Sequence, residues 1–444
     1  MTTFNAPSAI PPMQRVAANG LQLITSPCTG GLATIAIALP SGTTDETGAV
    51  PLGAALLLGR LLTLGSHQFP NAEALAMYLE TLGGVYNAGT DQDITAVTAS
   101  VPVDELEAAV LALVDLTTRP RLEPSVLRVE RRRLAGQFRA GAAVPASRAG
   151  DLADKLLWPA SPEGRTSREM AGAIPRLQRD ALLNLHAERF GAGGAALAIA
   201  TPGDLAAALD MAETATAAWT GGKPVPATAP SLGDERVAAA AMQADLAYLS
   251  LAAPAAPRGH PDADGLNLMA VVLGGGATSR LFVEVREKRG LCYGIGCRYV
   301  AQTNAGALRI EAGVPPDRLD DAIMAIMEQL QDLAVAATND EVAKARALLL
   351  GHLAMESDRP ETWARRYSRD LVQLGRRRTY ADIVTAMEAV TANDVRRLAS
   401  VYLGAAQLRF SVAGPGVTRA RVARSASRAQ RALDLQVHLA GVGD

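Results

Sequence analysis

Two stretches of the chain alternate between apolar and polar residues in a way that predicts β-strands. They run from Asp93 to Val101 and from Ala307 to Val314, and a proline follows each. Alternation with a period of two places every second side chain on the same face of a sheet. After each proline, apolar residues recur at helical spacing. Because a proline is tolerated where a helix begins, each stretch predicts a strand, a turn and then a helix.

These stretches belong to a repeat within the chain. The segment Val101–Leu106 reads VPVDEL, and Val314–Leu319 reads VPPDRL 213 residues later. The helical patterns that follow correspond at the same offset, with Ala109, Val110, Ala112 and Leu113 matched by Ala322, Ile323, Ala325 and Ile326. A second helical pattern, 215 residues apart in the two copies, matches Leu127, Arg131, Leu134 and Gly136 with Val342, Arg346, Leu349 and Gly351. A unit this long predicts a duplicated domain, because solenoid repeats span roughly 20–50 residues.

The join between the two copies is also visible in the sequence. Residues 221–230 are rich in glycine and proline, which continue neither a helix nor a central strand. We therefore expect a first domain at residues 1–220, a linker at 221–233 and a second domain at 234–444. The chain lacks short βαβ spacing and a dinucleotide-binding fingerprint. The order of elements predicts an α+β fold of two homologous α/β-sandwich domains, each with a mostly antiparallel sheet and helices packed on one face.

Composition narrows the classes of partner. The 444 residues are 49% hydrophobic, which suffices for two packed cores. The net charge of −2 gives no reason to expect nucleic acid or an anionic membrane as a partner. No apolar run reaches about 18 residues, so we expect no transmembrane helix. Three scattered cysteines, Cys28, Cys292 and Cys297, are expected to be buried thiols and not a disulfide framework.

The first residues, MTTFNAPSAIPPMQRV, contain neither a basic n-region nor an apolar h-region. A secretory signal peptide would show both. The expected location is therefore the cytoplasm, or the periplasm if a signal peptide has already been removed.

One segment of the second domain carries a specific motif. Gly274–Gly276 is followed by Ser279–Phe282, then by Arg286-Glu287, Gly290-Leu291 and Tyr293. On physical grounds this is a glycine loop, a short helix that ends at Gly290, and a strand. No Gly-Lys-Ser/Thr follows, so a phosphate-binding loop is excluded. The string resembles the signature of the pitrilysin/insulysin/mitochondrial-processing-peptidase family of zinc metallopeptidases. The resemblance extends over nearly the whole chain and includes the duplicated domain.

The family's zinc ligands are missing from the corresponding positions. Leu64-Gly65-Ser66 and Leu82–Ala88 resemble the segments that follow the inverted His-x-x-Glu-His motif in the family. Counting back from Gly65 places that motif at residues 56–60, which here read LLLGR. The third ligand is a glutamate seven residues after another glutamate. Here Glu130 is kept and Gln137 stands at the ligand position. A neutral amide is a poor zinc ligand, so we expect no metal and no cofactor on this chain.

The resemblance also implies roles for residues that remain. In the family, an arginine and a tyrosine seven residues apart hold the substrate backbone and stabilise the tetrahedral intermediate. Arg286 and Tyr293 have that spacing, and both side chains donate hydrogen bonds without a metal. The strand Val85–Thr90 resembles the family's substrate-side strand, which makes Asn87 and Ala88 candidate peptide-binding residues. We therefore expect Arg286 and Tyr293 to act in the zinc site of a homologous partner subunit.

The leading interpretation is the non-catalytic subunit of a heterodimeric zinc metallopeptidase, inactive alone and part of an endopeptidase when paired. Two other interpretations stay open. One is a structural member of the same fold without a catalytic role, like the core subunits of a respiratory complex. The other is a homodimeric peptide-binding or chaperone-like module. Taken without the resemblance, Arg286 would simply lie on a solvated charged face and Tyr293 would be an ordinary strand aromatic.

Overall fold

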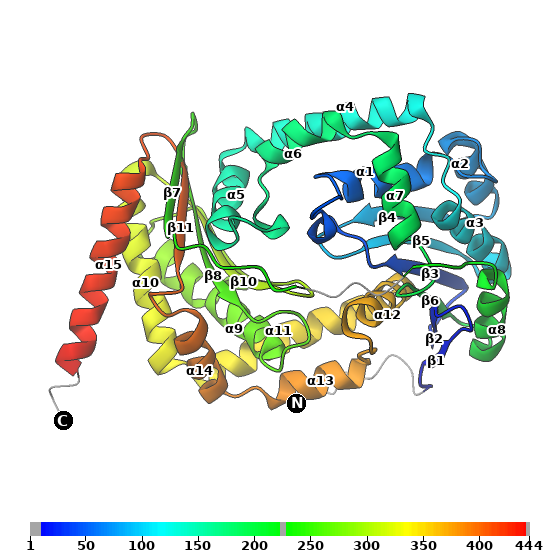
Figure 1. The fold of residues 1–444 in the computed structure, drawn as a ribbon. Coiled ribbons are helices and arrows are strands. Elements are labelled where there is room, and N and C mark those ends of the chain that lie inside the picture. The colour runs from blue at the N-terminus through cyan, green and yellow to red at the C-terminus, as the bar shows by residue number, and fades with distance from the viewer. Residues whose placement is uncertain (1–9, 223–227, 441–444) are drawn as a thin grey trace. The chain divides into compact units, whose positions relative to one another are not determined.

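The computed structural model describes residues 10–222 and 228–440, so residues 223–227 of the expected linker lie outside the described part of the chain. The described residues form two compact units, whose elements are labelled in Figure 1. Unit 1 consists of residues 10–137, 170–222 and 351–383. Unit 2 consists of residues 138–169, 228–350 and 384–440.

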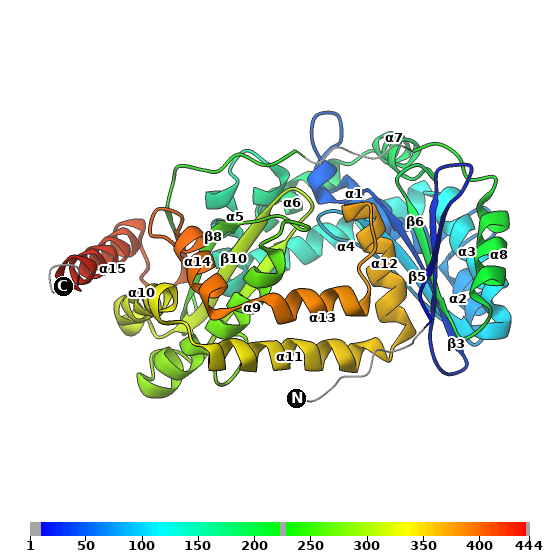
Figure 2. The same ribbon diagram turned by 90° about the horizontal axis from the view of Figure 1, so that it is seen from below.

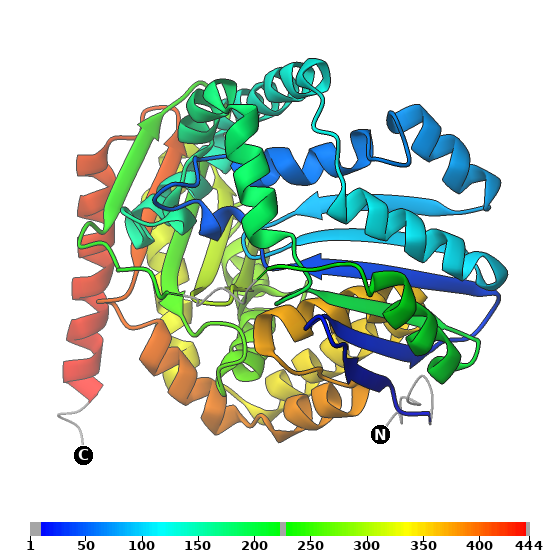
Figure 3. The ribbon, with the colours of Figure 1, turned by 45° about the vertical axis from the view of Figure 1, so that its right-hand side comes forward.

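Unit 1 contains a six-stranded sheet with the order β1-β2-β6-β3-β5-β4, coloured mainly blue and cyan in Figure 3. Only β2 and β6 pair in parallel; the other neighbours are antiparallel. The strands are β1 (Met13–Val16), β2 (Gln22–Pro27), β3 (Leu32–Leu39), β4 (Val85–Thr90), β5 (Thr95–Pro102) and β6 (Ala196–Thr201). β4 lies at the edge of the sheet and pairs only with β5.

Unit 2 contains a five-stranded sheet with the order β7-β11-β8-β10-β9. Here the single parallel pair is β7 with β11. The strands are β7 (Val237–Ala241), β8 (Ala247–Ala255), β9 (Gly294–Ala301), β10 (Gly306–Val314) and β11 (Arg409–Gly414). β9 occupies the edge, as β4 does in unit 1.

The two sheets have the same topology, which confirms the fold class expected from the repeat. Reading from the edge, β4-β5-β3-β6-β2 in unit 1 corresponds to β9-β10-β8-β11-β7 in unit 2. The strands predicted from alternation are β5 and β10. Each leads through a proline and a short 3₁₀ turn, η3 (Val103–Glu105) or η7 (Pro316–Arg318), into the predicted helix.

Helices follow the strands in the same order in both halves of the chain. In the first half they are α1 (Ala54–Leu61), α2 (Ala72–Thr81), α3 (Leu106–Thr118), α4 (Pro124–Ala142), α5 (Pro145–Leu157), α6 (Ser167–Ala173), α7 (Arg179–Arg189) and α8 (Leu205–Thr216). In the second half they are α9 (Ala263–Gly274), the π-helix η6 (Phe282–Lys288), α10 (Leu319–Ala336), α11 (Asn339–Ser357), α12 (Pro360–Leu374), α13 (Tyr380–Ala389), α14 (Ala392–Tyr402) and α15 (Arg419–Ala440). Short 3₁₀ turns complete the list: η1 (Thr43–Asp45), η2 (Leu62–Leu64), η4 (Pro162–Gly164) and η5 (Ile174–Arg176).

Side-chain caps begin several of these helices. The Asn71 side chain accepts a 2.9 Å hydrogen bond from the Ala74 backbone N–H at the start of α2. At the start of α14, Thr391 and Asp394 form a reciprocal capping box. Such caps satisfy backbone donors that have no partner inside the helix.

One helix of each half packs against the sheet of the other half's unit. α5 comes from the first half of the sequence and packs on β8 and β11 of unit 2. α12 comes from the second half and packs on β3 and β6 of unit 1. All six residues of β6 and seven of the eight in β3 are buried, so both faces of that sheet are covered at its centre. The compact units are thus not simply the two halves of the repeat.

The long helices α4 and α11 lead into these exchanged helices. Arg346 on α11 donates hydrogen bonds of 3.0 and 2.7 Å to the carbonyl oxygens of Met387 and Val390, which lie at the end of α13. These bonds hold α11 and α13 side by side, as Figure 2 shows.

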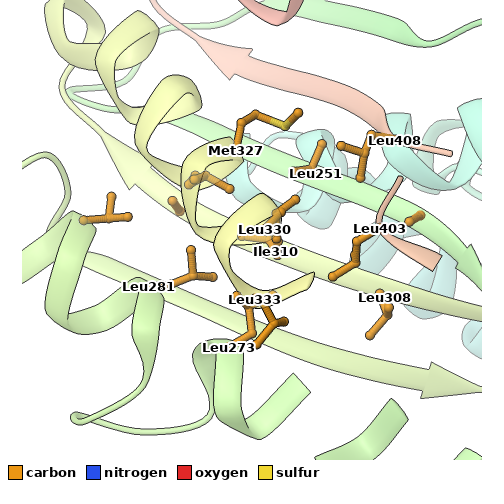
Figure 4. Close-up of a cluster of buried hydrophobic side chains, with 14 of the residues drawn as sticks. Leu251, Leu273, Leu281, Leu308, Ile310, Met327, Leu330, Leu333, Leu403 and Leu408 are labelled. Atoms are coloured by element: carbon orange, nitrogen blue, oxygen red, sulfur yellow. The ribbon is translucent and has the colours of Figure 1, made fainter. Parts of the chain in front are cut away.

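The core of unit 2 lies between one face of its sheet and α9, α10 and α14. Leu251 on β8 and Leu308 and Ile310 on β10 contribute the sheet side of this core (Figure 4). Leu273, Met327, Leu330 and Leu333 come from the helices. Along β10 the apolar residues alternate with Arg309 and Glu311, so the opposite face of the same strand is charged. Within the described residues, no helix is long and apolar enough to cross a membrane.

Candidate functional site

The residues at the expected zinc-ligand positions lie together in unit 1, and an arginine joins them. Arg60, at the end of α1, donates a 2.7 Å hydrogen bond from Nη1 to Oε1 of Gln137 on α4. Its Nε lies 3.4 Å from Oε2 of Glu130, one helical face along from Gln137. Glu130 is buried, with 4% of its surface exposed, and also accepts a 2.7 Å bond from Arg133. A guanidinium cation therefore neutralises the carboxylate that remains.

This arrangement does not fit a zinc ion. A zinc ligand needs a free lone pair, whereas the Arg60 guanidinium has only donors and keeps its proton. The Gln137 amide oxygen is already occupied by that guanidinium. Over the described ranges, no group of three or more His, Cys, Asp or Glu side chains is placed to hold a metal ion.

The position of the family's catalytic glutamate is closed as well. Gly59 is buried on α1, and a Cβ atom there would collide with the hydroxyl group of Thr90. Thr90 is held in place by a 2.8 Å hydrogen bond to the Thr95 hydroxyl, which donates to the Ser41 carbonyl oxygen. A longer side chain at residue 59 has no room unless Thr90 moves.

Arg286 and Tyr293 lie close together in unit 2. The Arg286 guanidinium carbon lies 4.4 Å from the Phe282 ring centroid and 5.5 Å from the Tyr293 ring centroid. Both distances allow cation–π attraction. The only ion pair of Arg286 among the described residues is a loose one, 3.5 Å from its Nε to Glu287. Tyr293 is 82% exposed and its hydroxyl makes no hydrogen bond within the described part of the chain.

The backbone around these two residues explains their approach. Arg286 lies in the last turn of η6, as predicted, and the helix is wound as a π-helix, a form that often occurs at functional sites. Gly290 has a φ of 59° and ends the helix, and Leu291 N–H bonds back to the Val285 carbonyl oxygen at 3.0 Å. Tyr293 was expected on the next strand. It lies one residue before β9 instead, in the bend that leads into the strand.

Arg280 anchors this segment, a role that the sequence analysis missed. Its side chain is 9% exposed. It donates to both carboxylate oxygens of Glu341 on α11, at 2.6 and 2.9 Å, and to Asp332 on α10 at 2.6 Å. Burial lowers the pKa of Arg280, but these carboxylates outweigh it and raise the pKa above its ordinary value. No spacing rule could pair Arg280 with Glu341, because 61 residues separate them.

The glycine loop before η6 has a packing role. Gly274 ends α9, and a Cβ atom there would collide with the backbone nitrogen of Cys297 on β9. The helix can therefore approach the edge strand only with glycine at this position.

The candidate peptide-binding residues Asn87 and Ala88 lie on β4 in unit 1. Their registered partners on β5 are Thr98 and Val97. Asn87 is exposed, and so is Val85, at 70%. Because β4 pairs on one side only, its other side leaves backbone N–H and C=O groups free to bond a further strand. The expected strand thus has the predicted bounds and an open edge, while its role in binding is untested.

This topology, repeated in two units, and a ligand position filled by arginine define a zinc-peptidase fold of the inactive type. Residues 24–148 match the family model described as insulinase (peptidase family M16), and residues 176–349 match the model described as peptidase M16 inactive domain. The chain belongs to peptidase family M16.

Similar proteins have the same extent. An uncharacterized zinc protease of Mycobacterium tuberculosis is 27% identical over 413 residues, which cover 90% of this chain and 94% of that protein. The mitochondrial-processing peptidase subunit beta of Dictyostelium discoideum is 21% identical over 417 residues, covering 89% and 87% of the two chains. A crystal structure described as a peptidase M16 inactive domain, from Pseudomonas fluorescens, superposes with a TM-score of 0.85 at 20% identity, covering 92% of this chain and 100% of that one. The structural likeness supports the fold.

Proposed function

We propose that this chain is the non-catalytic subunit of a heterodimeric zinc metallopeptidase, whose zinc ion is held by a homologous partner subunit. It binds peptide substrate and supplies Arg286 and Tyr293 to the partner's active site. One contrast carries the proposal. The Arg60 guanidinium fills the ligand position of this chain, whereas the Tyr293 hydroxyl faces solvent without a partner among the described residues.

The chemistry of the two side chains suits this role. A guanidinium and a phenol both donate hydrogen bonds, and donors aimed at a substrate carbonyl stabilise the negative charge that develops on its oxygen. The rings of Phe282 and Tyr293 beside Arg286 restrict the guanidinium before substrate arrives. Such preorganisation lowers the cost of ordering the site during the reaction.

The edge of β4 suits the binding of an extended peptide. A peptide that adds as a further strand would bond to the free backbone groups beside Asn87 and Ala88. The outward side chains of the strand, Val85 and Asn87, would then contact alternate residues of the peptide. No zinc and no other cofactor is needed on this chain for either task.

The test is peptide hydrolysis by this chain mixed with a homologue that carries His-x-x-Glu-His. Each protein alone should be nearly inactive, and the mixture should hydrolyse peptide. Tyr293→Phe should lower turnover of the mixture roughly 10²–10³-fold, the usual cost of one lost oxyanion donor. Arg286→Ala should raise KM as well, because a guanidinium also holds substrate carbonyl groups.

Controls separate chemistry from assembly. Arg318→Ala removes an arginine whose side chain is 57% exposed on η7 in the same unit, and should leave turnover unchanged. Size-exclusion chromatography should show that Tyr293→Phe still forms the heterodimer. If Tyr293→Phe keeps full turnover, or if this chain adds nothing to the partner's activity, the catalytic role is wrong and a structural or chaperone-like role replaces it.

A further inference from the structure

A second polar site lies in unit 2, apart from the residues discussed so far. It is a cavity of about 430 Å³ bounded by α5, β8, β9 and β10. Neither Arg286 nor Tyr293 lines it. Its volume falls in the range of small-molecule sites, roughly 300–1,000 Å³.

The strand register explains why this cavity is polar. Arg309 and Glu311 on β10 point away from the apolar core formed by Leu308 and Ile310. Arg309 is registered opposite Arg298 on β9, and Glu311 opposite Ser250 on β8. Residues of three adjacent strands thus share this face of the sheet.

The charges in the cavity are nearly balanced. Arg298 donates to both carboxylate oxygens of Glu311, at 2.9 and 3.0 Å. Arg309 forms an ion pair with Asp154 on the exchanged helix α5. Asp151, one turn earlier on α5, adds a further carboxyl group, and its oxygens accept bonds from Ser167. A ligand with several negative charges, such as phosphate, finds no surplus positive charge here.

Two buried polar atoms that line the cavity have no hydrogen-bond partner among the described residues. They are Nε of Arg309, whose residue is 7% exposed, and Oγ of Ser250, whose residue is 1% exposed. Buried polar atoms are almost always bonded, so an unpaired one needs an explanation such as a ligand or a water molecule. Both groups can donate, and each therefore requires an acceptor oxygen.

We propose that this cavity binds a zwitterionic short peptide, with the peptide carboxylate accepting hydrogen bonds from Arg309 Nε and Ser250 Oγ. The ammonium end of the ligand is attracted by the carboxyl group of Asp151. Because both arginines are already neutralised, a ligand with balanced charges suits the cavity better than an anion. Short peptides have this chemistry and fit the volume. The site does not depend on the proposed function.

The experiment is calorimetric titration of the full chain with trialanine. We expect saturable binding of one trialanine per chain, and at least tenfold weaker binding of trialanine amide, which lacks the carboxylate. N-acetylation of trialanine, which removes the ammonium charge, should also weaken binding. No binding of trialanine at millimolar concentration would mean that water satisfies Arg309 and Ser250, and would overturn the proposal. Equal affinity for the amide would overturn it as well.

Two variants locate the site without breaking the buried ion pair. Ser250→Ala removes one donor and should weaken trialanine binding roughly tenfold. Gly150→Leu fills the cavity, because a Cβ atom at Gly150 already lies 4.0 Å from a Glu311 carboxylate oxygen. It should abolish binding. Gly172→Leu, on α6 with open space around it, is the matched control and should bind normally. Undiminished binding by a folded Gly150→Leu variant would place the ligand elsewhere and overturn the proposal.

Discussion

The guanidinium of Arg60 donates a 2.7 Å hydrogen bond to the amide oxygen of Gln137, the residue that replaces the expected glutamate ligand. Each change alone would leave a problem. An arginine beside three intact ligands would repel a metal cation, and a lone glutamine would bind it poorly. Together with Glu130 they form a bonded set that needs no metal. The loss of the zinc site is therefore compensated structurally and is not a simple deletion of ligands.

The first prediction concerns metal content. The purified chain should hold no stoichiometric zinc, because the residues at the ligand positions are Leu56, Arg60 and Gln137. Elemental analysis after dialysis against zinc is the measurement. The partner subunit, treated identically, is the positive control. One tightly held zinc per chain at this position would contradict the account of Arg60.

The second prediction concerns the stability that Arg60 provides. Arg60→Ala removes one cation from the buried carboxylate of Glu130, while Arg133 remains. We expect a loss of about 1–3 kcal/mol in the free energy of unfolding, measured by urea titration. Arg121→Ala breaks an exposed pair with Glu123 and should cost no more than about 1 kcal/mol. Adding Glu130→Gln to Arg60→Ala should recover part of the loss, because no buried charge is then left. An additive effect would contradict the proposed pairing.

The third prediction concerns the closed position at Gly59. Gly59→Glu should destabilise the chain by about 1–3 kcal/mol, because the new Cβ atom meets the Thr90 hydroxyl. Adding Thr90→Ala should recover part of that stability, which a double-mutant cycle measures. Gly141→Glu on α4, where no atom lies within 4 Å of the new Cβ, is the control. Equal losses for Gly59→Glu and Gly141→Glu would show that packing against Thr90 is unimportant.

The fourth prediction is a pH dependence. Burial raises the pKa of Glu341, but hydrogen bonds from Arg280 outweigh it and hold the pKa below its ordinary value of 4.5. A carboxylate whose pKa is lowered on folding contributes stability above the unfolded pKa, and that contribution is lost as the pH falls through the folded pKa. Glu341→Gln should therefore be less stable than the parent at pH 7, and the difference should shrink below about pH 4.5.

Urea midpoints between pH 7 and pH 3 measure this difference. Glu361→Gln, which removes an exposed partner of Arg365, is the control and should differ little from the parent throughout. A gap between Glu341→Gln and the parent that stays constant down to pH 3 would contradict the assignment.

Local patterns in the sequence predicted much of the fold. Alternation located β5 and β10, and the repeat predicted two domains with the same element order. Gly290 ends η6 as expected, because its position needs a positive φ. The exchange of α5 and α12 could not be predicted in this way, since periodicity shows that a helix has an apolar face and not which sheet covers it.

The candidate site divides in the same way. The spacing of Arg286 and Tyr293 pointed to a pair, and the structure brings the guanidinium and the ring together. The bonds from Arg60 to Gln137 and from Arg280 to Glu341 join residues 77 and 61 positions apart, so no local pattern reveals them. The cavity beside Arg309 likewise depends on α5, a helix supplied by the other half of the chain.

The last prediction separates the two rings beside Arg286. Its guanidinium carbon lies 4.4 Å from the Phe282 ring centroid, closer than the 5.5 Å to that of Tyr293. Phe282→Leu keeps an apolar side chain but removes the cation–π contact, worth about 0.5–2 kcal/mol. If Arg286 acts in the partner's active site, this variant should lower kcat/KM of the assembled heterodimer by roughly 2- to 30-fold. Tyr293→Phe keeps the ring and loses only the hydroxyl donor, so it should lower kcat and leave KM nearly unchanged. Thermal melts of both variants check that the fold is intact. A Phe282→Leu heterodimer with normal KM and kcat would show that the contact does not position Arg286.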